Sequence, residues 1–157
     1  MTPKEFLDEI VVPNIDEFKV NFSSLRHAYN AISSVDALAA HLYWWLKNTG
    51  VDLKETDDSA YRKKLSDQSS DFRLLRDIAK AQKHVELKKH NPEISKASQV
   101  ESKQLGWGDG SYGQGHFGGV QQVVVKDNNN ELHYIEEIVN SALNFLTSEM
   151  QKHGLNS

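Results

Sequence analysis

Hydrophobic residues recur at intervals of three and four through residues 15–46, which is the spacing of helices that bury one face. Pro13 and Asn14 come just before, and we expect them to end a short amphipathic segment and to cap the next helix. Ser33 and Ser34 interrupt the pattern, so it predicts either two helices or one long bent helix. The apolar positions are Ile15, Phe18, Phe22, Leu25, Tyr29 and Ile32, followed by Val35, Leu38, Leu42, Trp45 and Leu46.

Two further helices are predicted after a polar connection. Asp57 or Asp58 is a suitable N-cap for the third helix, and the fourth starts at Ser70 or Asp71. Its expected end is the Asn-Pro pair at 91–92, because proline disfavours the helical conformation in the residue before it. The fourth helix has an apolar face formed by Leu74, Leu75, Ile78, Ala81 and Val85.

The pattern changes to that of strands in the last part of the chain. Residues 98–105 alternate weakly, and residues 120–126 are rich in β-branched side chains, which favour strands. Residues 127–130 have a turn composition, so residues 131–134 can return as a partner strand. A final amphipathic helix is predicted over residues 135–153.

These elements predict an α+β fold that is predominantly helical. We expect a bundle of about four main helices, with a small two- to three-stranded antiparallel sheet inserted before the C-terminal helix. The length of 157 residues suits a single domain over residues 1–157. That domain comprises a helical part at 1–91, a glycine-rich β-meander at 95–134 and the last helix at 135–153. Since a lone hairpin is marginal in water, the sheet must pack on the helices.

Composition excludes several classes of protein chemistry. The chain has no cysteine, so disulfides, thiolate metal sites and cysteine nucleophiles are excluded. No apolar run approaches the ~20 residues of a membrane-spanning helix, and the first residues lack the apolar core of a secretory signal. We therefore expect a cytoplasmic protein with no membrane partner, and no motif indicates a cofactor.

Positive charge is concentrated in the fourth helix, although the net charge of the chain is −4. Residues 73–90 hold six basic and two acidic residues, whereas the remainder holds 12 basic and 20 acidic ones. On a helical wheel, one arc of about 100° collects Arg73, Arg76, Asp77, Lys80 and His84. This stripe predicts a site for RNA or another phosphate-containing ligand, with anion-binding residues Arg73, Arg76, Lys80 and Lys83. The alternative is a solvated helix face stabilised by ion pairs.

Seven of the nine glycines lie within residues 106–119. This segment matches G-x-G-x-x-G twice, but a strand follows it, whereas the dinucleotide-binding motif opens a helix. Its large side chains predict a partner-binding surface made of Trp107, Tyr112, His116 and Phe117. The alternative is that these side chains anchor the loop on its own domain.

The histidines do not predict a metal site. His84 and His90 are six residues apart, so they do not share a helix face as an i, i+4 pair does. His116, His133 and His153 fall on different elements, and any metal site would have to be assembled by the fold. His41, at the edge of an apolar face, is expected to be a half-buried, hydrogen-bonded histidine.

Residues 76–84, Arg-Asp-Ile-Ala-Lys-Ala-Gln-Lys-His, resemble a signature of small uncharacterised bacterial and prophage proteins, approximately LRD-x-A-N-A-x-KH. The resemblance extends over residues 70–146, through a glycine- and aromatic-rich stretch and a hairpin, and it implies no established activity. The same helix is similar to that of HEPN-type domains, whose R-x4–6-H motif supplies catalytic arginine and histidine in ribonucleases. Here seven residues separate Arg76 from His84, and Asp77 replaces a common asparagine.

Two functional hypotheses follow from these patterns. The first is a binding or assembly module whose working face combines the basic stripe with the glycine-rich loop. The second, implied by the HEPN resemblance, is a metal-independent ribonuclease in a two-fold homodimer. There His84 would act as general acid and base, and Arg76 would stabilise the transition state.

Overall fold

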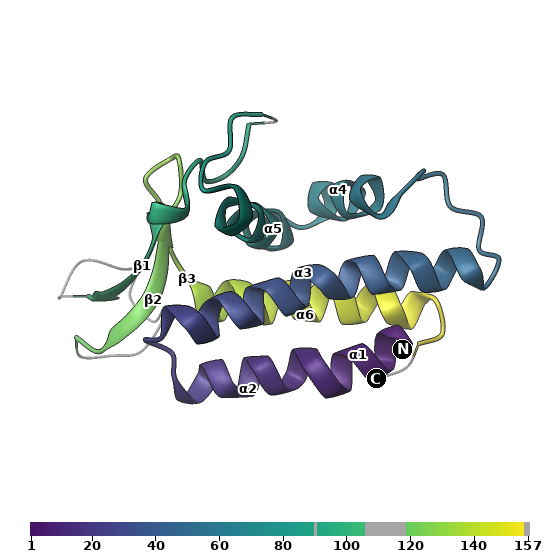
Figure 1. The fold of residues 1–157 in the computed structure, drawn as a ribbon, viewed down its shortest axis with the longest axis horizontal. Helices are drawn as coiled ribbons and strands as arrows, with labels where there is room; N and C mark the ends of the chain where they lie inside the picture. Colours follow the sequence, from purple (N-terminus) through teal and green to yellow (C-terminus); the bar gives the residue numbers. More distant parts are fainter. Residues whose placement is uncertain (90, 106–118, 156–157) are drawn as a thin grey trace.

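The computed structural model describes residues 1–89, 91–105 and 119–155 (Figure 1). The fold is α+β and predominantly helical, with a small three-stranded antiparallel sheet before the C-terminal helix, as predicted. The elements are α1 (Pro3–Phe6), η1 (Leu7–Val11), α2 (Val12–Val20), α3 (Leu25–Asn48), α4 (Asp58–Gln68), α5 (Ser70–His84), η2 (Ala97–Gln99), β1 (Val100–Gln104), β2 (Gln121–Lys126), β3 (Leu132–Tyr134) and α6 (Ile135–Lys152).

Helix α3 is the central element of the bundle, and it contacts α2, α4, α5 and α6. In Figure 1, α4 and α5 lie on one side of α3, and α1 and α2 lie on the other. The sheet lies at the end of the bundle where α3 and α6 begin, and β2 and β3 contact α6. The main core therefore forms around α3, from apolar faces that the three- and four-residue spacing indicates.

The N-terminal helix does not end at Pro13, contrary to the sequence prediction. The segment η1 has π-helical hydrogen bonds and leads directly into α2, with Pro13 in its first turn. Proline is tolerated in a first turn because it has no N–H group to donate there. The Asn14 side chain does not cap the helix; its Nδ2 donates to the Ile10 carbonyl oxygen at 2.8 Å.

The sequence allows either a break or a bend at Ser33 and Ser34, but the helix is continuous there, and the break falls earlier, inside the run of residues 15–32 with one apolar face. Both serines lie inside α3, where Ser34 Oγ donates to the Ala31 carbonyl oxygen at 2.9 Å and Ser33 Oγ donates to Gln82. These bonds satisfy the hydroxyls without interrupting the helix. The chain instead turns at residues 21–24, and Ser24 Oγ accepts from the backbone N–H of His27 to cap α3.

Helices α4 and α5 start as the sequence predicts, but α5 ends earlier. The carboxylate of Asp57 caps α4, and the hydroxyl of Ser69 caps α5. Helix α5 ends at His84, well before the predicted Asn-Pro pair at 91–92. The next residue, Val85, has φ 65° and is 70% exposed, so it does not belong to the buried face assigned to it. A left-handed β-branched residue cannot continue a right-handed helix.

The sheet has the order β1-β2-β3, with Val100 opposite Val125 and Val124 opposite Tyr134. Alternation along β2 separates the two faces of the sheet. Val123 and Val125 join the main core, whereas Val124 packs with Leu105 and Tyr134 in a second, smaller cluster. The backbone N–H of Val123 also donates to the Phe22 carbonyl oxygen at 3.0 Å, which attaches the sheet to the turn before α3.

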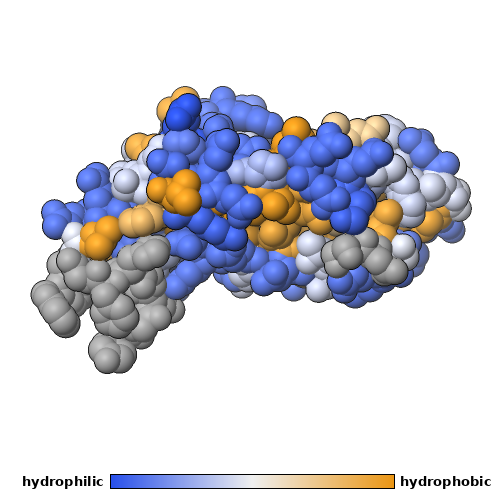
Figure 2. Space-filling model, turned by 90° about the horizontal axis from the view of Figure 1, so that it is seen from below, coloured by the Kyte–Doolittle hydropathy of each residue, from blue (hydrophilic) through white to orange (hydrophobic). Residues whose placement is uncertain are grey.

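The surface seen from the side of α1 and α2 carries hydrophobic patches between hydrophilic ones (Figure 2). Exposed apolar residues in this part of the chain include Ile10, Val12 and Val20. Among the described residues, no helix combines the length and the hydropathy that crossing a bilayer requires.

Candidate anion site on α5

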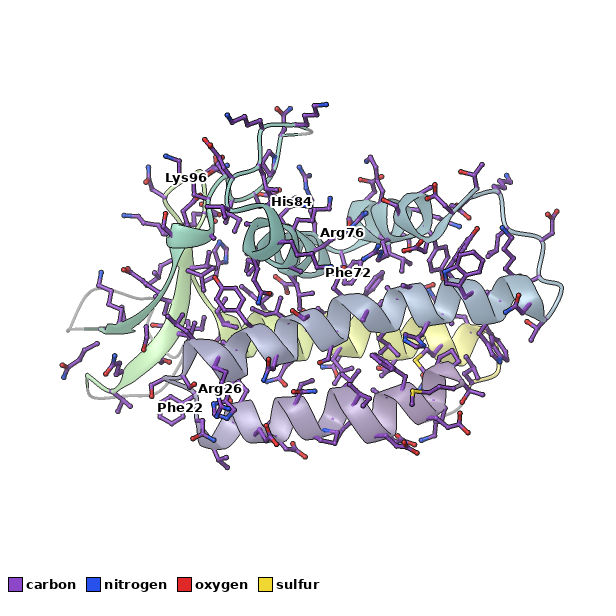
Figure 3. All side chains as sticks on the ribbon, viewed as in Figure 1. Phe22, Arg26, Phe72, Arg76, His84 and Lys96 are labelled. Atoms are coloured by element: carbon purple, nitrogen blue, oxygen red, sulfur yellow. The ribbon has the colours of Figure 1, made fainter. Side chains whose placement is uncertain are left out.

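Helix α5 is strongly amphipathic, and this positions the candidate site. Its apolar residues Leu74, Leu75, Ile78 and Ala81 are buried, and α5 packs against α3, α4 and α6. In Figure 3, Phe72 points from α5 toward α3, Arg76 lies between α5 and α4, and His84 lies on the side of α5 away from α3. The polar stripe predicted on α5 therefore faces partly α4 and partly solvent.

Arg76 is buried in spite of its charge, with 5% of the residue exposed. Its Nη2 donates to the carbonyl oxygen of Ser59 at 3.0 Å and to the Ser59 hydroxyl at 3.3 Å. Its Nε is buried and has no hydrogen-bond partner among the described residues, and Arg76 forms no ion pair within that part of the chain. Burial lowers the pKa of Arg76, although a guanidinium stays protonated in proteins.

A buried carboxylate, Asp36 on α3, contributes to the electrostatics around Arg76. Asp36 Oδ2 accepts from Arg62 Nη1 at 2.7 Å, and Arg62 also pairs with Asp58 at 2.7 Å. Burial raises the pKa of Asp36, while the charges of Arg62 and Arg76 act in the opposite direction. Asp36 Oδ1 has no hydrogen-bond partner among the described residues. The carboxylate therefore bonds to Arg62 and acts on Arg76 only through its charge.

The other charged residues of the stripe form specific pairs. Arg73 Nε lies 3.1 Å from Glu93 Oε1, and Arg73 Nη2 donates to the Asn91 carbonyl oxygen. Arg73 therefore pairs with Glu93 and not with Asp77, although the four-residue spacing of Arg73 and Asp77 on the helix would allow an ion pair. Asp77 Oδ2 accepts from the Glu93 backbone N–H at 2.9 Å. Lys80 lies 4.0 Å from Asp77 Oδ1, and its pKa is lowered by burial and then by the charge of Arg76.

Two hollows lie along the polar side of α5. The first, which we call the α4–α5 hollow, has a volume of about 120 Å³. Its charged lining has more basic than acidic residues, namely Lys63, Arg73, Arg76 and Lys80 against Asp67 and Asp77. Lys63 pairs with Asp67 at 3.2 Å, so the formal excess of positive charge in the lining belongs to the α5 side, where Arg73 pairs with Glu93 outside the lining.

The second hollow, which we call the α5–loop hollow, has a volume of about 440 Å³. It lies between α5 and the segment that follows, and its lining includes His84, Lys88 and Lys89. Asp77 and Lys80 line both hollows, so the two are adjacent. Together they present six basic side chains and three acidic ones, a formal excess of three positive charges.

Arg76 and His84 line different hollows. Eight residues along a helix correspond to a rise of about 12 Å, and Arg76 is buried beside α4 whereas His84 is exposed. Lys83, which the sequence adds to the anion site, is exposed and lines neither of these two hollows. The predicted partner-binding residues Trp107, Tyr112, His116 and Phe117 lie outside the described residues.

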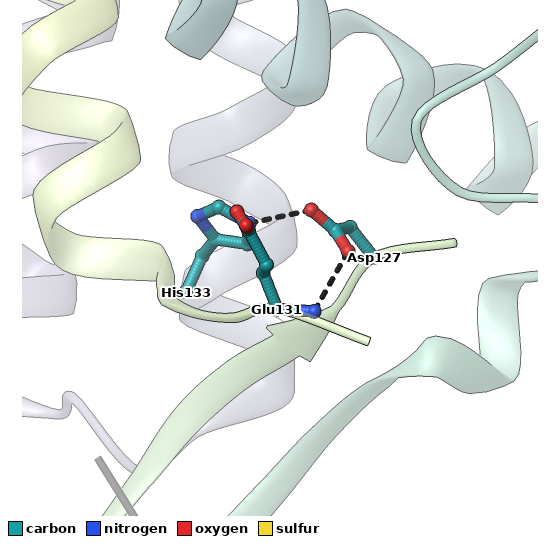
Figure 4. A group of neighbouring side chains, drawn as sticks. All are labelled: Asp127, Glu131 and His133. Carbon is teal, nitrogen blue, oxygen red and sulfur yellow. Dashed lines mark hydrogen bonds and ion pairs between the residues drawn. The ribbon is translucent and has the colours of Figure 1, made fainter. Parts of the chain in front are cut away.

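A group of possible metal ligands forms at the hairpin turn, where the sequence predicts no metal site (Figure 4). Asp127, Glu131 and His133 each place a ligand atom within 4.8 Å of the other two. Asp127 Oδ2 accepts from His133 Nε2 at 2.9 Å, and Oδ1 accepts from the backbone N–H groups of Asn129 and Glu131. These hydrogen bonds already use both oxygens of Asp127 to hold the turn. The sequence pattern that could have predicted this group is the turn composition at 127–130, followed by Glu131 and His133, which alternate along the next strand and so share one face.

His41 lies at another part of the surface, in a shallow apolar groove with Trp44 and Trp45. Its ring stacks on Phe6 with centroids 3.9 Å apart, and burial lowers its pKa. The half-burial expected from the sequence is confirmed, and the stacking on Phe6 was not predicted.

Sequence reasoning missed the contribution of α4 to the site. Lys63 and Ser66 line the α4–α5 hollow and Ser59 binds Arg76, yet none of them belongs to the charge-rich segment at 73–90. The i, i+3 spacing of Lys63 and Ser66 is a weak signal that they share a helix face. Comparison with protein-family models, curated proteins and solved structures found no match for this chain.

Proposed function

We propose that this protein is a binding module for RNA. The phosphate-bearing strand would be held along the polar side of α5. The observation that supports the proposal best is the adjacency of the α4–α5 hollow and the α5–loop hollow, which share Asp77 and Lys80. Adjacent basic hollows suit a ligand with repeated negative charge better than an isolated small anion.

The lysines of the α5–loop hollow are suited to the non-specific part of this binding. The Lys88 side chain is 78% exposed, and its ion pair with Glu86, at 3.6 Å, is also exposed, so little desolvation opposes contact with a phosphate. Lys89 is also exposed. Contacts of this kind release counterions from the nucleic acid and make affinity fall with salt.

The proposal is tested by fluorescence anisotropy of a labelled single-stranded RNA oligonucleotide at several salt concentrations. The double variant Lys88→Gln/Lys89→Gln should weaken binding and reduce the slope of log affinity against log salt by about 1 to 1.5, the value for two lost contacts to a single strand. Lys4→Gln/Lys19→Gln is the matched control, because it removes the same charge from α1 and α2. Equal losses in the two double variants, or no binding by the wild type, would contradict the proposal.

The HEPN-like ribonuclease is the alternative for the same surface. It receives less support from the geometry, because a shared role at one scissile bond needs both side chains in one cleft, and Arg76 and His84 line different hollows. Its test is cleavage of mixed RNA in EDTA by the wild type, Arg76→Ala and His84→Ala. Loss of cleavage in both variants, each shown to be folded by circular dichroism, would favour the enzyme over the binding module.

A further inference from the structure

We propose that the α4–α5 hollow binds a terminal phosphate of the RNA strand, a phosphate monoester, rather than an internal phosphodiester. This inference rests on the proposed function and assigns the two hollows different tasks. The α4–α5 hollow would fix one end of the strand, and the α5–loop hollow would hold the backbone that follows.

Arg76 is a buried charge that lines the α4–α5 hollow. It is 5% exposed, it forms no ion pair among the described residues, and its buried Nε has no partner there. A buried charge without a direct ion pair is costly: burial lowers the pKa of Arg76, although the charges of Asp36 and Asp77 act in the opposite direction through space. A bound anion beside Arg76 would add a directly paired counter-charge, and a guanidinium is the side chain best suited to hold phosphate oxygens.

The charge of the α4–α5 hollow suits a phosphate monoester. The lining of the α4–α5 hollow has a formal excess of two positive charges. A phosphate monoester carries about −1.5 to −2 at neutral pH, whereas each backbone diester carries one negative charge. The monoester is therefore the better match to this lining, in which the basic side chains would hold the phosphate because the Ser66 hydroxyl already donates to the Arg62 carbonyl oxygen at 2.8 Å.

The α4–α5 hollow also has room for one phosphate group. Its volume of about 120 Å³ equals the share of about four liquid water molecules. Sites for drug-sized ligands start at about 300 Å³, so the rest of the strand would lie outside this hollow. The larger hollow that shares Asp77 and Lys80 lies beside it, and a strand that ends in the α4–α5 hollow can continue there.

The experiment compares two RNA oligonucleotides of one sequence, one with a 5′-phosphate and one with a 5′-hydroxyl, by anisotropy of a 3′ label. The wild type should bind the phosphorylated strand about tenfold more tightly, because charge-assisted hydrogen bonds to one phosphate are lost in the other strand. Inorganic phosphate in excess should reduce the affinity for the phosphorylated strand to that for the hydroxyl strand. At matched ionic strength, set with chloride in place of phosphate, it should leave binding of the hydroxyl strand unchanged.

A substitution then assigns the preference to the hollow. Replacement of Arg76 itself can unfold the chain, so Arg73→Gln, whose side chain is 41% exposed, is the main variant. It should lose most of the preference for the phosphorylated strand, whereas its affinity for the hydroxyl strand should fall no more than that of a variant that loses one positive charge elsewhere on the surface. Arg26→Gln is the matched control, because Arg26 is an exposed arginine on α3 outside the lining of both hollows.

The outcomes separate this inference from the proposed function. Equal affinity of the wild type for both strands overturns the terminal-phosphate site, while the binding module remains supported. A phosphoserine peptide that binds more tightly than the phosphorylated strand overturns the assignment to RNA. Binding of neither strand overturns both proposals.

Discussion

The guanidinium of Arg76 on α5 donates to the carbonyl oxygen of Ser59 at 3.0 Å, and Ser59 lies in the first turn of α4. This bond makes the start of α4 part of the candidate site. A change that loosens the start of α4 should therefore alter both stability and ligand binding, although it touches no basic residue.

Asp57→Ala tests this connection. Asp57 Oδ1 accepts from the Ala60 backbone N–H at 2.7 Å, and loss of such an N-cap costs about 1 kcal/mol in the free energy of unfolding. We expect that loss in urea denaturation, together with weaker binding of the phosphorylated strand. Thr2→Ala removes a similar cap from α1 and serves as the control. A similar fall in RNA affinity in both variants would show that the weaker binding does not result from loosening the start of α4.

Asp36→Asn should be one of the more destabilising changes at the site. Asp36 is buried and its Oδ2 accepts from Arg62 at 2.7 Å, so the variant removes one partner of a largely buried ion pair. We expect a loss of about 2 kcal/mol in the free energy of unfolding, because Arg62 keeps Asp58 as a partner. Asp67→Asn, which breaks the exposed pair with Lys63, should cost at most about 0.5 kcal/mol. Equal losses of unfolding free energy in the two variants would show that burial does not make the Asp36–Arg62 pair more important for stability.

The stability of the hairpin turn should depend on pH through Asp127. Burial acts to raise the pKa of Asp127, but hydrogen bonds from His133 and from the backbone of Glu131 and Asn129 outweigh it and lower the pKa below 3.8. Because the folded pKa is below the unfolded one, the contribution of Asp127 is present above pH 3.8. It is lost as the pH falls through the folded value.

Asp127→Asn tests the direction of this effect. The difference in free energy of unfolding between the wild type and the variant should be larger at pH about 6 than at pH about 3. Urea denaturation at the two pH values measures it. A difference that stays constant, or that grows on acidification, would show that the carboxylate is not stabilised by these hydrogen bonds.

Val85→Gly should stabilise the protein. Val85 has φ 65° and ψ −43°, and the Glu86 backbone N–H donates to the His84 carbonyl oxygen across it, which is the strained classic form of the γ-turn. Relief of strain of about 1–3 kcal/mol exceeds the entropy of about 0.4–1 kcal/mol that glycine adds to the unfolded chain. We expect a gain of about 1 kcal/mol.

Val20→Gly is the matched control for the strain at Val85. Val20 is 77% exposed and ends α2, so it resembles Val85 in exposure but stands in a helix. Glycine there should destabilise by up to about 1 kcal/mol. If both glycine variants lose stability in urea denaturation, the backbone at Val85 is not strained.

Much of the secondary structure could be predicted because its signals are local. The carboxylate of Asp57 caps α4 as expected, and the β-branched run at 120–126 forms β2. The errors occurred where local signals were ambiguous. Ser33 and Ser34 allow either a break or a bend; their hydroxyls bond to α3 and α5 and the helix continues, while the break falls at residues 21–24, where none was predicted.

The end of α5 is a similar case. The Asn-Pro pair at 91–92 is a strong stop signal, yet the helix ends at His84. The reason is tertiary, because the Leu87 backbone N–H donates to the Ser95 carbonyl oxygen and Ala97 donates to Val85, and these bonds turn the chain back. Local helix propensities cannot show whether these hydrogen bonds between distant residues are more stable than one more turn of helix.

The sequence by itself determined which helix faces are apolar, where the strands lie and that positive charge gathers on one stripe, since these depend on spacing within a few residues. Only the tertiary structure decided that Arg76 is buried beside Ser59, 17 residues away, while His84 stays exposed two turns along the same helix. Burial and charge compensation depend on which distant segments pack against a side chain. The α4–α5 hollow, like the Asp36–Arg62 pair, therefore exists only in the folded chain.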